Sequence, residues 1–370
     1  MIPVCTPFLG KNEKKYLLDC VETNWISSSG KYIEKFEDKF SQYCHAKYGV
    51  ATTSGTTALH LAFAAVGINK GDEVIMPTFN IASTAFAALY CGAKPVFVDS
   101  QPDTWNIDPQ RIERKITKKT KAIVPVHMYG HPCDMTAIMR IARKHKLIVI
   151  EDAAEAHGAK YRGKRVGGIG DIGCFSFYGN KIITCGEGGM VVTSNKRISD
   201  RCQNLKNLSF LEEKRFWHKE IGFNYRMTNI QAALGLAQFE KIDQYIKMRR
   251  RNALFYNSLL KDIRGIILPV ERPDVKNIYW MYSVLVGRNF GMSRDEFMKR
   301  LKGMGIESRI FFIPMHQQPV LKKMKIVSKE KFPIAEDIAR RGIYLPSGSG
   351  LKKKEIEYVC DCIRKIRRKS

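Results

Sequence analysis

Short apolar runs alternate with longer amphipathic stretches along the first half of the chain. Each apolar run has the length of a buried strand, and each amphipathic stretch repeats its apolar residues at the spacing of a helix that packs one face on a core. The pattern predicts helices at residues 11–23, 33–46, 58–66, 82–91 and 135–144, and strands at residues 48–52, 73–76, 95–99, 122–126, 147–151, 174–177 and 190–193. Such repeated strand and helix units favour a largely parallel sheet with helices on both faces.

The rest of the chain follows a different pattern. Residues 195–230 are charged and aromatic without a clear period, so we expect a long connection there rather than core. Beyond it the pattern predicts one long helix at residues 228–260, strands at 280–286 and 306–313, and helices at 294–302, 334–341 and 354–364. We therefore expect an α/β protein with two domains, a large one at residues 1–245 built on the mostly parallel sheet and a smaller α+β one at residues 246–370.

Composition is ordinary apart from the charge. Apolar residues make up 44% and charged residues 26% of the 370, as in a folded globular protein, but the formal net charge is +26. A basic chain can bind nucleic acid or polyanionic small molecules. No RNP, zinc-finger or helix-turn-helix signature accompanies the charge, so a nucleic-acid-binding protein is the weaker alternative.

Cysteine spacing and the apolar run lengths indicate the compartment. The ten cysteines are scattered, and the close pair Cys360 and Cys362 lacks the spacing of a zinc site, so we expect reduced thiols and no metal. No run approaches the roughly 18 apolar residues of a membrane span, and the first residues lack the features of a signal peptide. We expect a cytoplasmic protein without a membrane-spanning segment.

Three local signals carry candidate chemistry. The turn SGTT at residues 54–57 joins a strand to a helix, where free amides and the helix dipole favour an anion, although a plain helix cap explains it too. Asp152 follows a buried strand, where it could cap a helix or hold a cation. Lys181 lies between a strand and a glycine-rich turn, and if it is buried there its amine can form a Schiff base. Together the three match the phosphate, ring nitrogen and aldehyde of pyridoxal phosphate (PLP).

Longer motifs add a family resemblance that covers essentially the whole chain. The sequence resembles the PLP-dependent sugar-nucleotide aminotransferases of fold type I in TSGTTALHLA (53–62), VIEDAAEAHGA (149–159), FSFYGNKIITCGEGGM (175–190) and IGFNYRMTNIQAALGLAQ (221–238). Within that family it is most similar to the GDP-perosamine synthase group, through WISSSGKYIEKFE (25–37), FYGNK and WHKEIGFNYRMTNI (217–230).

The resemblance implies a role for each matching position around the cofactor. Lys181 would form the internal aldimine with PLP and move protons, Asp152 would pair with the pyridinium, and Glu155 would face the ring hydroxyl, where many relatives have glutamine. Four residues of the same subunit would hold the phosphate: Ser54, Gly55, Thr56 and Ser176. Asn224 would reach that phosphate from the neighbouring subunit, which implies an obligatory homodimer with a composite active site.

Substrate contacts are implied at five further positions, which are Trp25, Ser27, His218, Arg226 and His316. For both histidines a structural role is an equally open interpretation. One position departs from the family, because relatives tend to have an aromatic residue that stacks on the cofactor ring where this chain has Ile81. Phe79 and His157 are the alternatives for that role, and the sequence does not rank them.

The activity implied is transfer of an amino group from L-glutamate to C4 of a nucleotide-linked 4-keto-6-deoxyhexose, as for GDP-perosamine, in polysaccharide biosynthesis. The same reaction on a UDP- or dTDP-linked 4-keto-6-deoxyglucose, of the UDP-viosamine type, is the main alternative. A sugar 3-dehydratase would have histidine in place of Lys181, and a catalytically idle regulator would be expected to lack Lys181 or Asp152. Both residues are present, so an active aminotransferase is favoured.

Overall fold

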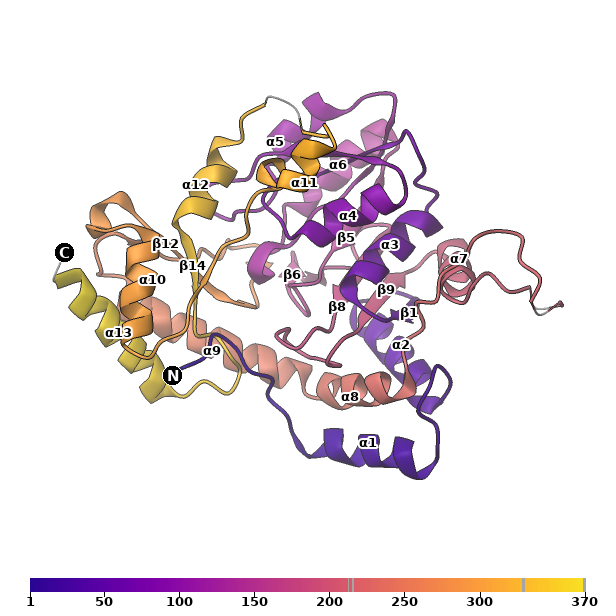
Figure 1. Cartoon of the computed structure of the whole chain (residues 1–370), viewed down its shortest axis with the longest axis horizontal. Helices are drawn as coiled ribbons and strands as arrows, with labels where there is room; N and C mark the ends of the chain where they lie inside the picture. Colours follow the sequence, from indigo (N-terminus) through magenta and orange to yellow (C-terminus); the bar gives the residue numbers. More distant parts are fainter. Residues whose placement is uncertain (212, 215, 328–329, 369–370) are drawn as a thin grey trace.

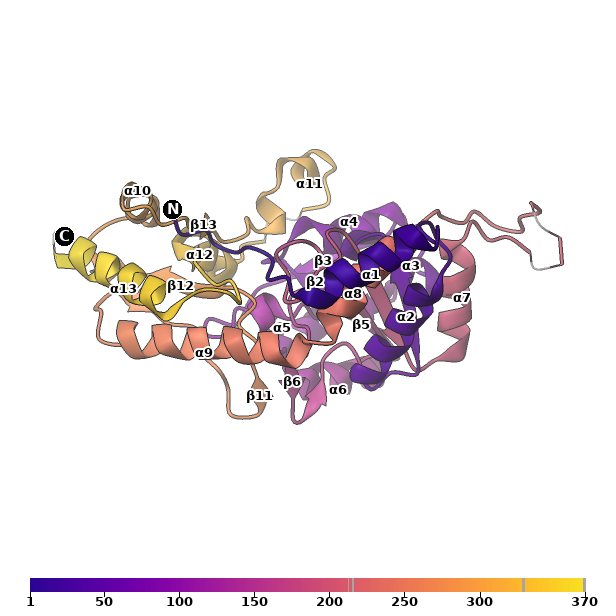
Figure 2. The same cartoon turned by 90° about the horizontal axis from the view of Figure 1, so that it is seen from below.

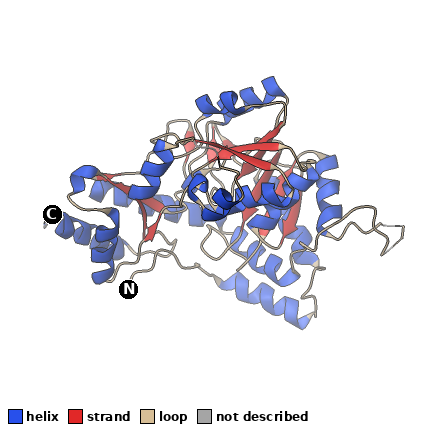
Figure 3. Cartoon of the chain, turned by 45° about the horizontal axis from the view of Figure 1, so that its top comes forward, coloured by secondary structure: helices blue, strands red, loops and turns tan. Residues whose placement is uncertain are grey.

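The computed structural model describes residues 1–211, 213–214, 216–327 and 330–368, which form two larger sheets surrounded by helices and a third, short sheet (Figures 1 and 3). Within these residues the larger sheet has seven strands in the order β1-β9-β8-β5-β4-β2-β3. They are β1 (Tyr48–Thr52), β2 (Glu73–Pro77), β3 (Lys94–Val98), β4 (Thr120–Ile123), β5 (Ile148–Asp152), β8 (Ile172–Ser176) and β9 (Gly189–Thr193). Only β9 runs antiparallel to its neighbours β1 and β8, so the predicted mostly parallel sheet is confirmed.

Helices cover both faces of this sheet. Successive side chains of a strand point to opposite faces, and β8 shows both. The Cys174 thiol lies 3.6 Å from the Ala58 carbonyl on one face, and the Phe175 ring lies 4.8 Å from the Phe40 ring on the other. The helices packed around the large sheet are α1 (Lys11–Glu22), α2 (Lys31–Tyr43), α3 (Gly55–Ala65), α4 (Ala82–Tyr90), α5 (Pro109–Ile112), α6 (Met135–His145), α7 (Lys196–Lys206) and α8 (Asn229–Phe239). Figure 2 shows α1, α2 and α8 side by side, in agreement with their contacts.

The C-terminal part of the chain forms a smaller antiparallel sheet with the order β10-β12-β14-β13. Its strands are β10 (Ile266–Ile267), β12 (Tyr282–Val286), β13 (Arg309–Ile310) and β14 (Gly342–Leu345), and its helices are α9 (Ile242–Leu260), α10 (Arg294–Gly303), α11 (Pro319–Lys323), α12 (Pro333–Arg341) and α13 (Lys353–Arg368). A third, short sheet contains β6 (Lys160–Tyr161), β7 (Lys164–Arg165) and β11 (Val275–Lys276). The N-terminal end of the chain contacts the C-terminal part, because Ile2 pairs with Ile306.

Three elements differ from the sequence-based expectation. The helix predicted at 228–260 is two helices, α8 and α9, because Lys241 leaves the helical backbone with φ −116° and ψ 11° while the apolar spacing continues across the break. The connection expected at 195–230 begins with α7, which Asn195 caps and which buries only a few side chains, so its apolar signal is weak. The strand expected at 306–313 is reduced to β13 and the isolated bridge from Ile306 to Ile2. None of the described helices combines the length and apolarity that a membrane crossing needs.

Candidate active site

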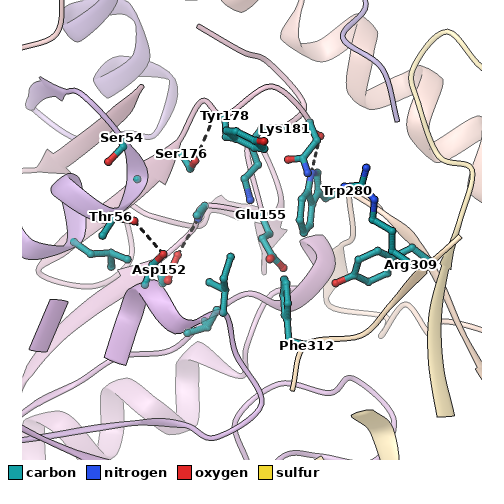
Figure 4. A pocket seen from close by; sticks show the side chains of 18 of the residues that line it. Ser54, Thr56, Asp152, Glu155, Ser176, Tyr178, Lys181, Trp280, Arg309 and Phe312 are labelled. Atoms are coloured by element: carbon teal, nitrogen blue, oxygen red, sulfur yellow. Dashed lines mark hydrogen bonds between the residues drawn. The ribbon is translucent and has the colours of Figure 1, made fainter. Parts of the chain in front are cut away.

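A cavity of about 650 Å³ lies between the two sheets, next to the carboxyl ends of β5 and β8 (Figure 4). Ligands of largely parallel sheets bind at such ends. The large-sheet part of the chain supplies one wall, with Ser54, Gly55, Thr56, Ile81, Asp152, Glu155, Ser176, Asn180 and Lys181 among its residues. The C-terminal part supplies the other, with Trp280, Arg309, Phe312 and Tyr344. Seven of the eight predicted cofactor contacts therefore share one cavity.

The start of α3 forms one end of the cavity. The Ser54 hydroxyl accepts a hydrogen bond from the Thr57 amide (3.2 Å), and the Thr57 hydroxyl accepts one from the Ser54 amide (2.9 Å), so the two residues cap the helix reciprocally. A Cβ on Gly55 would lie 2.6 Å from the Ser176 Cβ, so only glycine lets the helix start approach β8 this closely. Amides at a helix start lack intrahelical acceptors and carry the positive end of the dipole. The start of α3 therefore fits a phosphate.

Asp152 ends β5 and is 2% exposed. Its carboxylate accepts hydrogen bonds from the Thr84 hydroxyl (2.6 Å) and the Ala154 amide (3.1 Å). Burial raises the pKa of this carboxyl, although both hydrogen bonds and the nearby Lys181 charge oppose that rise. A buried carboxylate is stabilised by a cation, so the site fits a protonated ring nitrogen.

Glu155 lies close to the same wall and is also buried. One of its carboxylate oxygens accepts a hydrogen bond from the Tyr129 amide at 2.8 Å. Burial raises the pKa of Glu155 to about 7, against the lowering effect of Lys181. A carboxyl with that pKa is partly protonated at neutral pH, so it can both donate and accept a hydrogen bond where many relatives have glutamine.

Lys181 follows β8 in a turn closed by its amide, which donates to the Tyr178 carbonyl at 2.9 Å. Burial lowers the pKa of its amine, while the charges of Glu155 and Asp152 raise it. The Nζ atom lies 3.9 Å from the centroid of the Trp280 indole. A buried lysine with a lowered pKa is the form in which an amine reacts with a carbonyl.

The structure places Asn224 and the five predicted substrate contacts outside this protomer's cavity lining. Asn224 is exposed, accepts a hydrogen bond from Arg226 (2.9 Å) and pairs with Asn207, which directly follows α7. Trp25, Ser27 and His218 are exposed. Arg226 lines a separate hollow of about 320 Å³ with the serines of residues 28–29. Their functional roles stay predictions.

His316 is buried in a structural setting. Its Nδ1 lies 2.7 Å from the Thr78 hydroxyl, its Nε2 lies 3.1 Å from the Glu336 carboxylate, and its ring packs on Phe332. Burial lowers the pKa of this histidine. These contacts support the structural interpretation that the sequence left open.

The structure also narrows the choice of the residue that would cover the cofactor ring. Ile81 lines the cavity. Phe79 packs against Tyr129 and Phe311 in the core, with no exposed surface. His157 is equally buried and packs on Phe40 and other aromatic rings. Neither alternative therefore lines the cavity.

Sequence reasoning missed the C-terminal wall of the cavity. Trp280 lies two residues before β12 and Arg309 lies in β13, in a part of the chain whose motifs are not next to the three chemical signals. Their position depends on how the second sheet packs on the first, which no local spacing encodes. The one available signal was an indole in the first position of the strand predicted at 280–286.

Comparisons with known proteins agree with this geometry. The model of the DegT/DnrJ/EryC1/StrS aminotransferase family matches residues 7–364. The chain is 47% identical over 366 residues to a GDP-perosamine synthase of Escherichia coli O157:H7, covering 99% of this chain and 98% of that protein. It is 44% identical over 369 residues to a GDP-perosamine synthase of Caulobacter vibrioides, covering 99% and 98%. A crystal structure of S. venezuelae DesV with a ketimine intermediate superposes with a TM-score of 0.90 at 34% identity, covering 96% and 94%.

Proposed function

The chain belongs to the DegT/DnrJ/EryC1/StrS aminotransferase family, and from this premise we propose that it moves the amino group of L-glutamate to C4 of a GDP-linked 4-keto-6-deoxyhexose. It is a PLP-dependent aminotransferase of fold type I, as the sequence predicted. The guanine nucleotide and the sugar are supported by the relatives named GDP-perosamine synthase, which match nearly the whole chain. A role in polysaccharide biosynthesis belongs to the same proposal.

One observation carries the chemical part of the proposal. A lysine amine, a buried carboxylate and a helix start that fits a phosphate face a single cavity. A surface lysine and two plain helix caps would have no reason to meet there. PLP, when bound, supplies an electrophilic carbon and a ring that withdraws electrons from the bonds next to the amino group.

The residues of this chain then have defined tasks. Ser54, Gly55, Thr56 and Ser176 would hold the phosphate, and Ile81 would pack on the ring. Asp152, fixed by its hydrogen bonds from Thr84 and Ala154, would keep a proton on the ring nitrogen.

Lys181 would hold the cofactor covalently and, once released, take a proton from the α carbon of glutamate. In the second half of the reaction it would deliver a proton to C4 of the sugar. The remaining polar group of that wall, Glu155, would meet the ring hydroxyl.

We further propose that two copies of the chain complete each site. Asn224 would reach the phosphate of the neighbouring subunit, and Trp25, Ser27, His218 and Arg226 would contact the sugar nucleotide across the dimer. The exposure of Asn224 outside the cavity lining of its own chain supports this arrangement. His316 would act through packing. A cytoplasmic location stays a prediction.

The test is an assay with glutamate and a panel of GDP-, UDP- and dTDP-linked 4-keto-6-deoxyhexoses, with products identified by mass and NMR. We expect a 4-amino sugar from the GDP substrate and a glutamate-dependent rate. Preference for a UDP or dTDP substrate would establish the viosamine-type alternative. Protein that takes up no PLP and aminates none of the sugars would refute the whole proposal.

A further inference from the structure

Trp280 meets the catalytic lysine segment at two points. The face of its indole lies under the Lys181 amine, with Nζ 3.9 Å from the ring centroid. The indole Nε1–H donates a hydrogen bond of 2.8 Å to the Asn180 carbonyl, one residue before Lys181. Trp280 is 3% exposed, and it lines the cavity together with Lys181 (Figure 4).

The position of Trp280 is fixed independently of the lysine. Arg249 on α9 is 3% exposed, and its guanidinium donates to the Trp280 carbonyl at 2.7 Å. Its other donors reach the Ser349 hydroxyl (3.1 Å) and the Cys5 sulfur (3.2 Å). The Cys5 thiol in turn lies 3.6 Å from the Asn180 carbonyl. One buried arginine therefore joins the backbone of Trp280 to the N-terminal segment and, through Cys5, to the loop that carries Lys181.

The chemistry of the contact is that of a cation on an aromatic face. The indole face is the most electron-rich surface among the side chains, and it attracts an ammonium group, more strongly where water is excluded. On the other side of the amine, Glu155 and Asp152 attract the same charge. The amine of a released Lys181 can therefore lie on the indole face or pair with a carboxylate. Pairing with a carboxylate would draw the amine away from the substrate.

We propose that the indole face of Trp280 is the resting place of the Lys181 ammonium group whenever the lysine is not bound to the cofactor. Trp280 is then a positioning residue, which keeps the amine beside the reacting carbon between its two proton transfers. This inference rests on the proposed function, because it assumes that Lys181 alternates between a bound and a released state. The aromatic face is the essential feature, and the hydrogen bond to Asn180 orients it.

The first test uses cofactor-free protein and two variants. Trp280→Phe keeps an aromatic face but loses the indole N–H, whereas Trp280→Met keeps apolar volume but loses the face. Acylation of Lys181 is followed against pH by mass spectrometry of its peptide, with the exposed Lys196 as an internal reference for the reagent. Loss of a cation–π contact should weaken proton binding by the Lys181 amine about 3- to 30-fold. The pH midpoint of Lys181 acylation should therefore fall by about 0.5 to 1.5 pH units in the Met variant.

The second test uses PLP-loaded enzyme. The Met variant should lose about 10-fold in kcat, because the released amine is no longer held, while KM for the sugar nucleotide changes less than about 2-fold. Trp280→Phe should keep kcat within about 3-fold of the wild type and its titration midpoint within a few tenths of a pH unit. If the Met variant does not fold, Trp280→Leu takes its place.

A wild-type midpoint in the Met variant overturns the inference. So does an equal shift in the Phe and Met variants, because the aromatic face would then be irrelevant. Either result leaves the proposed function standing if the wild type binds PLP and Lys181→Ala is inactive. If the wild type binds no PLP and transfers no amino group, the proposed function and this inference fall together.

Discussion

The two walls of the cavity are built in different ways. On the large-sheet wall the groups are charged or polar, as Ser54, Asp152 and Lys181 are, and hydrogen bonds from partners near and far in the sequence hold Asp152 in place. On the C-terminal wall the groups are mainly aromatic, and Trp280 is held by Arg249 and Tyr344 by Tyr129. The difference suggests a division of labour in which the first wall reacts and the second positions.

The sharpest test of that division is Lys181→Ala. If the large-sheet wall carries the chemistry, removing its amine should lower turnover by about 10⁴-fold or more and abolish the absorbance of the bound cofactor linkage. Absorbance spectra and a coupled glutamate assay measure both. Lys196→Ala is the matched control, because that lysine is exposed and pairs only with Asp200 among the described residues. An alanine variant that still turns over would contradict the assignment of the lysine.

The next effect should come from Asp152→Asn. The amide keeps the shape of the side chain but removes the charge that a protonated ring nitrogen needs, so kcat should fall by about 100- to 1000-fold with the protein still folded. Steady-state kinetics with saturating PLP measure the loss. Asp134→Asn is a suitable control, because Asp134 caps α6 outside the cavity lining and asparagine caps equally well. A variant with nearly full kcat would show that the ring nitrogen needs no buried anion here.

A smaller effect, and one that depends on pH, is expected from Glu155. Its pKa is about 7 in the folded protein and ordinarily 4.5. Between these values the folded protein binds more protons than the unfolded chain, so the free energy of unfolding falls as pH rises from about 4.5 to 7. The loss can reach about 3 kcal/mol for a shift of this size.

Glu155→Gln should remove this slope. Urea unfolding of cofactor-free protein at several pH values from 5 to 8 measures it, with the wild type in parallel. The glutamine variant should be the more stable protein at pH 8 and should gain nothing at pH 5. Equal slopes in the two proteins would mean that Glu155 stays ionised, and its proposed contact with a ring hydroxyl would then need another donor.

The sequence predicts the residues of the large-sheet wall better than those of the C-terminal wall. Strand ends can be predicted from the apolar runs, and the carboxyl ends of parallel strands meet at one edge, so the groups at Ser54, Asp152 and Lys181 could be expected together. The helix α7 was missed because it buries few side chains, and the break at Lys241 was missed because the apolar spacing continues across it. Trp280 and Arg309 were missed because their place depends on packing between sheets.

The substrate contacts could not be placed for a related reason. Asn224 and Arg226 do not line the cavity, and the pattern of one chain contains no information on where a second copy would lie in the proposed dimer. For His316 the sequence left a substrate contact and a structural role equally open, and its contacts with Thr78 and Glu336 support the structural role. Local motifs therefore predicted the groups that the cavity brings together, whereas the substrate contacts stay predictions.

The smallest expected effect tests the positioning wall, through Tyr344→Phe. The Tyr344 hydroxyl lies 3.1 Å from the Tyr129 hydroxyl in a buried contact, so its loss should cost about 1 kcal/mol of unfolding free energy. Turnover should change by less than about 2-fold, because this hydroxyl supports the cavity without reacting. Urea unfolding and steady-state kinetics measure the two quantities, and Tyr358→Phe, an exposed hydroxyl bonded to the Met304 carbonyl, is the control. A loss of more than 10-fold in kcat would show that the C-terminal wall also takes part in the reaction, and the division between the two walls would no longer hold.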